Sequence, residues 1–439
     1  MLPENFLLCL VCFQDCFTAP SFQRFLTLMA GWILCTSKHT ITGVIRAAGV
    51  VGKREHGGYH RFFNTAAWSA DEVGLALMAL ILTLLPKNNR VVLTVDDTLA
   101  RHTGKHIEGG AMHRDPLLST GKRPFFHFGH NWVVVAVVFV FLRWGKTFSL
   151  PVLVRLYRTE KLNKKLDRPH RKKTELCDEM LQLAAESFPN RKFLVIGDNA
   201  YVNRSVIRPL PINIDLLGRG RMDAALYAPP PEKKAKQRGR RPVRGARVAS
   251  PLARAKRKQW KKIEARIYGR ICTVKVQVFD AQWYIVGRGR LFRFVLIRDW
   301  PGHKKDDVLV TTDLSMSAEQ IIESYCMRWS LEETFEWAKG RLGFEDPQNR
   351  TEKAVERTAP MALWIYSLVV YWYACWSRGR RHLPFRVDPW NRKKQNPTFA
   401  DMLATLRRES WTVWISDQAG KTHLDQKYFE PLLEVAVNG

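Results

Sequence analysis

Four residues in the stretch YCMRWSLEETFEWAK, residues 325–339, have side chains that could act together on a phosphate group. Tyr325, Arg328, Glu332 and Lys339 are offset by 0, 3, 7 and 14 positions. On an α-helix, at about 100° per residue, they would fall within an arc of about 60°. A solvated helix face can have this composition by chance. A site that binds a phosphate and a metal ion would require it.

Further carboxylates follow two apolar segments. RVVLTVDDT, residues 90–98, is a predicted buried strand that reaches Asp96 and Asp97, and KFLVIGDNAY, residues 192–201, is a strand that ends at Asp198. Sites in open α/β sheets form at the carboxyl ends of strands. Together with Glu332, two such carboxylates could bind a pair of Mg²⁺ ions, with Mn²⁺ as a substitute, and close carboxylates repel one another without a cation.

Each of these carboxylates also has an ordinary structural explanation. An Asp at a strand end is often a turn or cap residue, and an acid on a helix is often solvated. Glu333 and Glu336 lie close to Glu332 on the same predicted helix, and helical geometry alone does not choose among the three. The choice between Asp96 and Asp97 also stays open at this level.

The elements that must position these groups are predicted from residue patterns. Apolar β-branched runs over 131–142 and in TFSLPVLVRLY indicate strands, residues 172–188 indicate an amphipathic helix, and residues 1–85 read mainly as helices. Ser317 and Gln320 form a capping-box signal before the 325–339 stretch, and Gly340 and Gly343 end it. The pattern predicts a mixed α/β sheet with a helical N-terminal region.

The charge balance points to a polyanionic partner. The chain of 439 residues has 70 Lys and Arg against 41 Asp and Glu, a net charge of +29, which makes nucleic acid the first candidate and an anionic membrane surface the second. The longest apolar run, 361–376, has 16 residues and is short for a membrane span, so a buried helix is predicted. Scattered cysteines and an N-terminus without a basic n-region favour a cytoplasmic protein with reduced thiols.

A basic segment interrupts the alternation of strands and helices. Residues 233–262 contain 14 Lys or Arg and no acid, which predicts a flexible arm that tracks the DNA backbone, with Arg240, Arg241 and Arg244 as contacts. A solvated tail is the alternative.

At this point the sequence resembles a known family. Tyr-x2-Arg-x3-Glu-x6-Lys, matched by Tyr325, Arg328, Glu332 and Lys339, is the signature of IS4-type DDE transposases. VDDT looks like the family's first Asp motif and favours Asp97 over Asp96, and IGDNAYVNRSVI looks like the second motif and assigns Asp198. The overall pattern looks closest to the IS701 branch, or DDE superfamily endonucleases, and the resemblance covers roughly residues 90–340.

The resemblance implies an RNase H-like mixed-sheet core with a β-rich insertion between the second Asp and the Glu. It implies cleavage at transposon ends and transfer of the 3′-OH to target DNA, with Mg²⁺ bound by Asp97, Asp198 and Glu332. Tyr325, Arg328 and Lys339 would contact DNA phosphate. The resemblance also leads us to expect a homodimer or higher oligomer that binds the terminal inverted repeats. The expected location is the bacterial cytoplasm, at the nucleoid.

In characterised relatives a Trp in the strand before the signature helix helps to hold a flipped base, but DDVLVTT has none. Trp283 and Trp300 are the nearest candidates, and both are expected to be core or sheet residues.

The predicted organisation has five parts. They are a helical N-terminal domain that could bind DNA (1–85), the first part of the catalytic core (86–218), the basic arm and β-rich insertion (219–307), the second part of the core with the signature helix (308–376), and a basic C-terminal region (377–439). Two rival functions remain: a decayed transposase that binds DNA without cutting it, and another RNase H-like nuclease.

Overall fold

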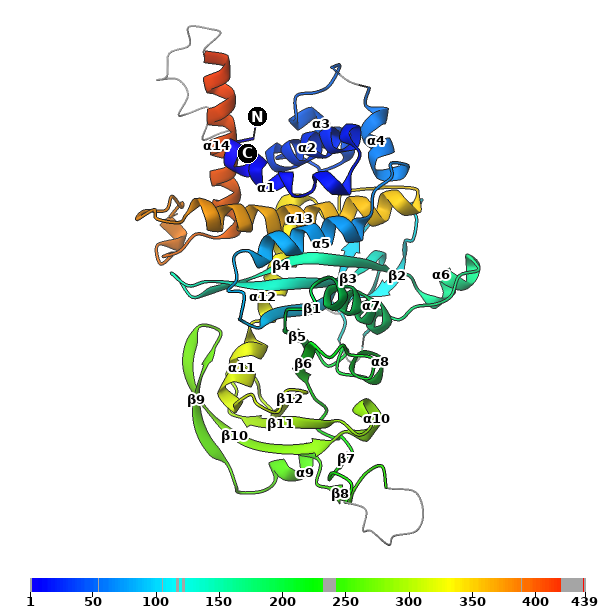
Figure 1. Ribbon diagram of the computed structural model, residues 1–439, viewed down its shortest axis with the longest axis vertical. Coiled ribbons are helices and arrows are strands. Elements are labelled where there is room, and N and C mark those ends of the chain that lie inside the picture. Colours follow the sequence, from blue (N-terminus) through cyan, green and yellow to red (C-terminus); the bar gives the residue numbers. More distant parts are fainter. Residues whose placement is uncertain are drawn as a thin grey trace.

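The computed structural model describes residues 2–53, 55–104, 106–115, 118–120, 123–231, 242–387, 389–419 and 437. Helices gather at one end of an elongated molecule, and a large mixed sheet runs from them to the other end (Figure 1). The predicted fold class, an α/β protein with an RNase H-like mixed sheet, a β-rich insertion and N-terminal helices, is confirmed.

Strand β1 (Val91–Arg101) is central in the part of the sheet that contains Asp96 and Asp97. On one side it pairs antiparallel with β3 (Phe126–Phe141), which also pairs with β2 (Ala111–Arg114) and β4 (Lys146–Tyr157). On the other side it pairs parallel with β5 (Phe193–Gly197), which pairs parallel with β6 (Ile214–Arg219). The predicted strand ended at the aspartates, whereas β1 continues to Arg101 because β3 pairs with it along that length.

The insertion continues the same sheet. Strand β12 (Asp307–Thr311) pairs antiparallel with β6, and the order then runs through β11 (Leu291–Arg298) and β10 (Arg270–Gln282). Strand β9 (Lys261–Ile267) forms a hairpin with β10, and the short strands β7 (Leu226–Tyr227) and β8 (Arg247–Val248) lie at the far edge. The part of the predicted basic arm that is described, residues 242–262, is folded into β8, helix α9 (Pro251–Ala255) and the start of β9.

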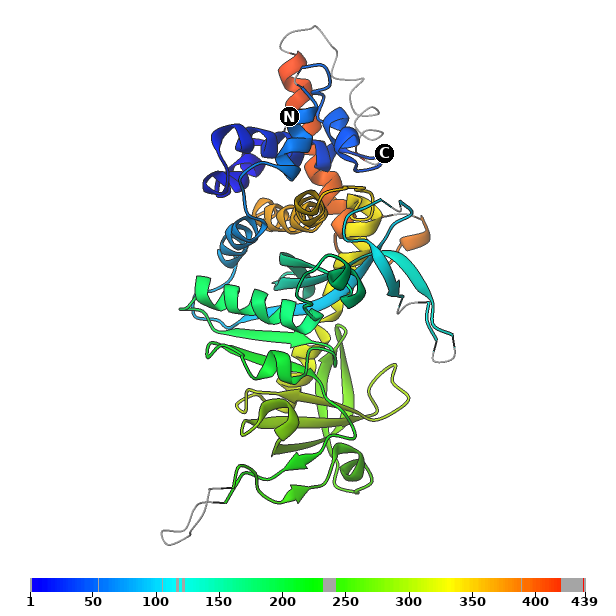
Figure 2. The same cartoon turned by 90° about the vertical axis from the view of Figure 1, so that its right-hand side faces the viewer.

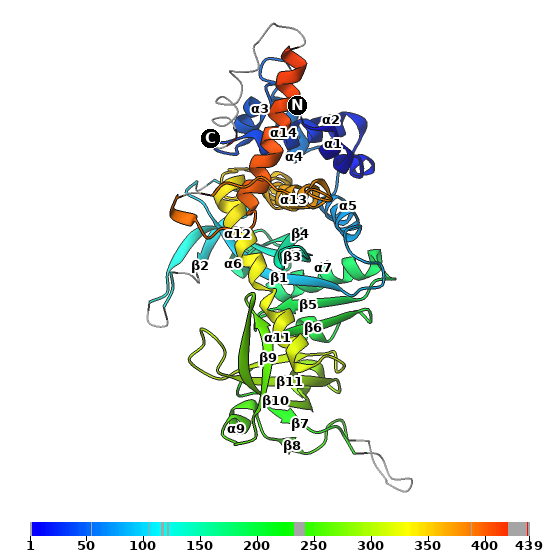
Figure 3. The same ribbon diagram turned by 90° about the vertical axis from the view of Figure 1, so that its left-hand side faces the viewer.

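Helices cover the part of the sheet around β1 on both faces. Helix α7 (Lys173–Ser187) packs on β3 and β4 with the short helix α8 (Arg204–Ile207) beside it, while the short helices α6 (Glu160–Lys165) and α10 (Tyr284–Gly287) follow β4 and β10. Helices α11 (Ala318–Cys326) and α12 (Trp329–Leu342) run along the other face, past β1 and β6 (Figure 3).

The remaining helices form a layer above the sheet (Figure 2). They are α1 (Glu4–Val11), η1 (Gln14–Cys16), α2 (Ala19–Leu34), α3 (Ile41–Ala47), α4 (Gly57–Asn64) and α14 (Phe399–Ala419), whereas α5 (Ala70–Leu82) packs beside α13 on β4 and η2 (Pro389–Asn391) follows α13 in the chain (Figure 1). Helix α13 (Glu352–Trp376) lies between this layer and β4 and is buried over most of its length, which confirms the buried helix predicted at 361–376. Within the described residues, no helix is long and apolar enough to cross a membrane.

Candidate active site

The predicted signature helix is two helices that meet at Met327 and Arg328. The capping box of Ser317 and Gln320 opens α11 as predicted, and α12 ends at Gly343 in the left-handed conformation, with φ 62°. At the junction, backbone N–H groups donate hydrogen bonds of 3.0–3.1 Å to the carbonyl three residues earlier. The donor–acceptor pairs are Met327–Ser324, Arg328–Tyr325, Ser330–Met327 and Leu331–Arg328. These tighter turns replace α-helical geometry at this point and change the direction of the side chains that follow.

The junction directs Arg328 between two carboxylates. Its Nη1 lies 2.7 Å from Oδ2 of Asp96, and its Nη2 lies 2.7 Å from Oε1 of Glu332. The exposed fractions of the Arg328 and Asp96 side chains are 17% and 16%. One mostly buried guanidinium therefore joins a carboxylate of the central strand to a carboxylate of the helix.

Strand pairing places Asp198 close to Asp96. The parallel register ends with the pair Thr94 of β1 and Ile196 of β5; Asp96 lies two residues further along β1, and Asp198 directly follows Gly197, the last residue of β5. Even-numbered side chains of β5, Leu194 and Ile196, pack against α11. Because side chains alternate between the faces of a strand, Asp96 belongs to the face that α11 and α12 cover, and Asp198 follows β5 at the same end of the parallel pair, close enough for its charge to act on Asp96.

The electrostatics of Asp96 agree with this grouping. Burial raises the pKa of Asp96 to about 7, the Arg328 guanidinium opposes that rise, and the charges of Asp97 and Asp198 add to it. The carboxylate of Asp198 also accepts a hydrogen bond from the backbone N–H of Ala200 at 2.8 Å, which fixes the turn after β5.

Asp97 lies on the opposite face of β1. Its Oδ2 is 2.5 Å from Nζ of Lys173 at the start of α7, and its Oδ1 is 3.4 Å from the hydroxyl of buried Tyr201. Asp97 therefore ties β1 to α7 and to the segment after Asp198. The geometry favours Asp96 as the partner of Glu332, whereas the motif favours Asp97.

The neighbouring acids on α12 have other surroundings. Glu333 faces Lys146 of β4 at 3.7 Å, and Glu336 is exposed on the next turn. The geometry thus favours Glu332 among the three glutamates.

Tyr325 and Lys339, the other two residues expected on the same arc of the helix, contact other groups. Tyr325 packs edge-on against buried Trp300, with 6.1 Å between ring centroids. Lys339 donates to the carbonyl of Leu99 at 2.7 Å and lies 3.7 Å from Glu345. Lys339 is therefore bound to β1 beyond the aspartates.

An aromatic pair beside the carboxylates was not predicted. Tyr268, at the tip of the β9–β10 hairpin, meets Trp329 with 6.4 Å between ring centroids, and both rings are about half exposed. Trp329 follows Arg328 directly. Trp283 and Trp300 are buried, as predicted. Polar and apolar residues alternate along β9, and with the Tyr268–Gly269 turn they indicate the hairpin. No local signal in the sequence shows which surface the tip of the hairpin contacts.

The predicted contacts of the basic arm divide into two groups. Arg240 and Arg241 lie outside the described residues. The guanidinium of Arg244 stacks over Tyr227 and Tyr284, at 4.4 and 5.4 Å from the ring centroids. Arg244 thus helps to hold the base of the arm on the insertion.

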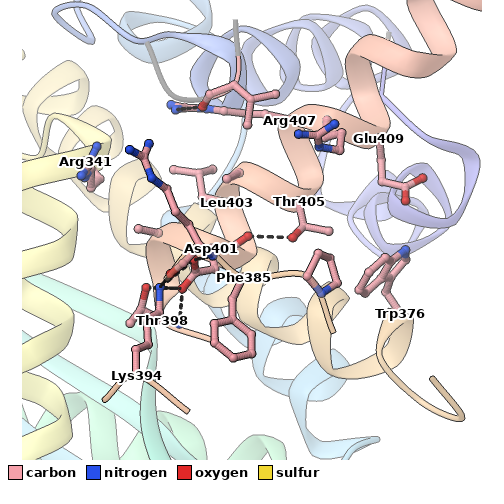
Figure 4. Close-up of a pocket in the computed structure, with 16 residues that line it drawn as sticks. Arg341, Trp376, Phe385, Lys394, Thr398, Asp401, Leu403, Thr405, Arg407 and Glu409 are labelled. Carbon is pink, nitrogen blue, oxygen red and sulfur yellow. Dashed lines mark hydrogen bonds and ion pairs between the residues drawn. The ribbon is translucent and has the colours of Figure 1, made fainter. Parts of the chain in front are cut away.

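A pocket of about 590 Å³ lies away from these carboxylates, beside α14 (Figure 4). Asp401 there accepts hydrogen bonds from the backbone N–H of Thr398 and from Lys394, and Arg407 donates to the carbonyls of Ile33 and Cys35 at the end of α2. These polar groups cap helices, so the pocket is a structural junction.

The carboxylates of Asp96, Asp198 and Glu332 have the chemistry that a hard divalent cation requires, although they are not arranged as a complete ligand set. In the described part of the chain, no group of three or more His, Cys, Asp or Glu side chains is arranged to hold a metal ion. Asp96, Asp198 and Glu332 supply oxygen donors, as Mg²⁺ and Mn²⁺ prefer. A positive guanidinium already stands between two of them, so the position accepts a cation.

Comparison with known families assigns much of the chain to a family. The model of a family described as DDE superfamily endonuclease matches residues 12–284. That range includes Asp96, Asp97 and Asp198 and ends before Glu332. No curated protein matches the chain.

Proposed function

Because this chain belongs to the DDE superfamily of endonucleases, we propose that it is the transposase of an insertion sequence, of the IS4 type and closest to the IS701 branch. It would cut DNA at the terminal repeats of the element and transfer the 3′-OH to target DNA. The observation that supports this most directly is the grouping of Asp96, Arg328 and Glu332 close to Asp198.

The chain's own residues have distinct tasks in this reaction. Asp96, Asp198 and Glu332 would hold the Mg²⁺ ions, which when bound activate the attacking oxygen and stabilise the leaving one. The Arg328 guanidinium offers two parallel N–H donors for a phosphate near the cut, and Lys339 offers a point charge. The sequence motif assigns Asp97 in place of Asp96, and DNA cleavage by the Asp96→Asn and Asp97→Asn variants distinguishes the two assignments.

The aromatic pair gives the substrate strand an apolar surface at the site. Bases of single-stranded DNA stack on aromatic rings with little sequence preference. Tyr268 and Trp329 are half exposed and lie next to Arg328, so a base that leaves the DNA duplex near the cut would stack on their rings. They take the place of the tryptophan that the strand before α11 lacks.

The β9–β10 hairpin supplies a basic path that leads to this point. Residues 256–275 contain eight Lys or Arg and one acid, Glu264. The apolar side chains of β9 pack inward beside α11, so its charged side chains face solvent. The exposed basic residues are Lys256, Arg257, Lys258, Lys261, Lys262, Arg266 and Arg270. We infer that the DNA backbone follows this path, together with the arm that contains Arg240, Arg241 and Arg244.

Neutralising part of the path is expected to weaken DNA binding and its dependence on salt. For K261Q/K262Q/R266Q, the slope of log K against log salt should become shallower by about 2 to 3, because each lost phosphate contact removes about 0.9. The measurement is fluorescence anisotropy with a labelled duplex at several salt concentrations. K261R/K262R keeps the charge and should keep the slope. An unchanged slope in the triple variant would mean that DNA lies elsewhere.

The proposed function is tested by cleavage of a labelled duplex that bears the element's own terminal repeat. Wild type with Mg²⁺ is expected to cut at the repeat boundary, and removal of the metal with EDTA should stop it. Asp198→Asn should bind the duplex and leave it intact. Binding without cutting by wild type would support the rival proposal of a decayed transposase, and cutting without regard to the repeat would support another nuclease.

A further inference from the structure

Arg328 has a contact pattern that phosphate binding alone does not explain. Each arm of its guanidinium makes one 2.7 Å contact with a different carboxylate, Asp96 on β1 and Glu332 on α12. A divalent ion would bridge the same two groups. The guanidinium of Arg328 therefore occupies the position between the two carboxylates that a divalent cation would take.

The backbone enforces this position. The tight turns at Met327 and Arg328 lie at the junction of α11 and α12, and the Arg328 side chain is mostly buried against Asp96 and the ring of Tyr325. Two nearby cations have other partners: Lys146 of β4 faces Glu333, and Lys339 of α12 donates to the carbonyl of Leu99. In the described structure, Arg328 is the basic side chain that joins Asp96 to Glu332.

We propose that Arg328 is an internal cation that closes the metal site until DNA arrives. A DNA phosphate is a competing bidentate partner for the guanidinium, and such pairs are strong. Once Arg328 turns to the phosphate, Asp96 and Glu332 are left as two close negative groups, which then favour a divalent ion. DNA and metal thus bind cooperatively, with DNA first. This inference rests on the proposed function of the same site.

The coupling is reciprocal, so it can be measured as a change in metal affinity without any cleavage. Mn²⁺ binding to the full chain is measured by electron paramagnetic resonance, with and without a duplex that ends at the repeat boundary, so that no bond remains to be cut. Without DNA, Arg328→Gln is expected to bind Mn²⁺ at least about 10-fold more tightly than wild type. The duplex should raise the affinity of wild type at least about 5-fold and that of Arg328→Gln less than about 2-fold.

Two variants control for charge and for folding. Arg328→Lys keeps a cation at the junction and should retain weak Mn²⁺ binding in the absence of DNA. Lys146→Gln removes a cation that faces the same helix but pairs with Glu333, and should leave Mn²⁺ affinity unchanged. Thermal unfolding of each variant checks that the fold is retained.

Equal Mn²⁺ affinity of wild type and Arg328→Gln without DNA would overturn the inference. If wild type still cuts the terminal repeat with Mg²⁺ in that case, the proposed function stands and only the coupling fails. If wild type neither cuts nor binds Mn²⁺ with the duplex present, the proposed function and the inference fall together.

Discussion

Glu332→Gln is expected to reduce DNA cleavage by at least about 10³-fold, which corresponds to about 4 kcal/mol in the activation barrier. The amide keeps the size of the side chain but loses the charge that would hold a cation with Asp96. DNA binding should change less than about 2-fold, because the basic path along β9 is untouched. Single-turnover cleavage and anisotropy on the same duplex measure the two effects separately.

Two neighbouring glutamates provide matched controls for this variant. Glu333 pairs with Lys146 and Glu336 is exposed, so Glu333→Gln and Glu336→Gln should both keep near wild-type cleavage. If Glu332→Gln cuts normally and Glu336→Gln does not, the catalytic carboxylate lies one turn further along α12.

The adjacent aspartates of β1 should give opposite results. Asp96→Asn is expected to abolish cleavage, again by about 10³-fold or more, because Asp96 lies close to Asp198 and meets Glu332 through Arg328. Asp97→Asn should keep cleavage within about 10-fold of wild type. It should lower the free energy of unfolding by about 1–2 kcal/mol, because the half-buried pair with Lys173 is lost.

Both variants are measured in the same cleavage assay and by denaturant unfolding. Loss of cleavage in Asp97→Asn together with activity in Asp96→Asn would restore the assignment that the motif favours. Lys173→Met offers an independent check, since it breaks the Asp97 pair without touching either aspartate, and should lower stability while leaving cleavage in place.

Much of the scaffold could be predicted from the sequence because its signals are local. The β-branched runs that became β1, β3 and β5, and the capping box at Ser317, specify their elements through neighbouring residues alone. The β-rich insertion followed from the family resemblance and from the 133 residues between Asp198 and Glu332.

The details of the site could not be predicted because they depend on tertiary contacts. Asp96 and Asp97 are identical in chemistry, and only the packing of α11 and α12 on one face of the sheet distinguishes them. The helical offsets of the 325–339 stretch assumed a continuous α-helix, whereas the backbone tightens at Arg328. Tyr268 reaches Trp329 across about 60 residues of sequence, so no short pattern links them.

The pairing of β6 with β12 has a mechanical consequence for cutting. Together with the pairing of β12 and β11, it joins the insertion to β5 and β6 through backbone hydrogen bonds, so the described strands of the two parts form one continuous sheet. A DNA backbone that binds along β9 as proposed would then be held at a constant distance from Asp96 and Asp198. In the proposed reaction, the position of the cut, counted in nucleotides from the bound segment, would therefore be set by the geometry of the sheet and would not vary with the length of a flexible linker.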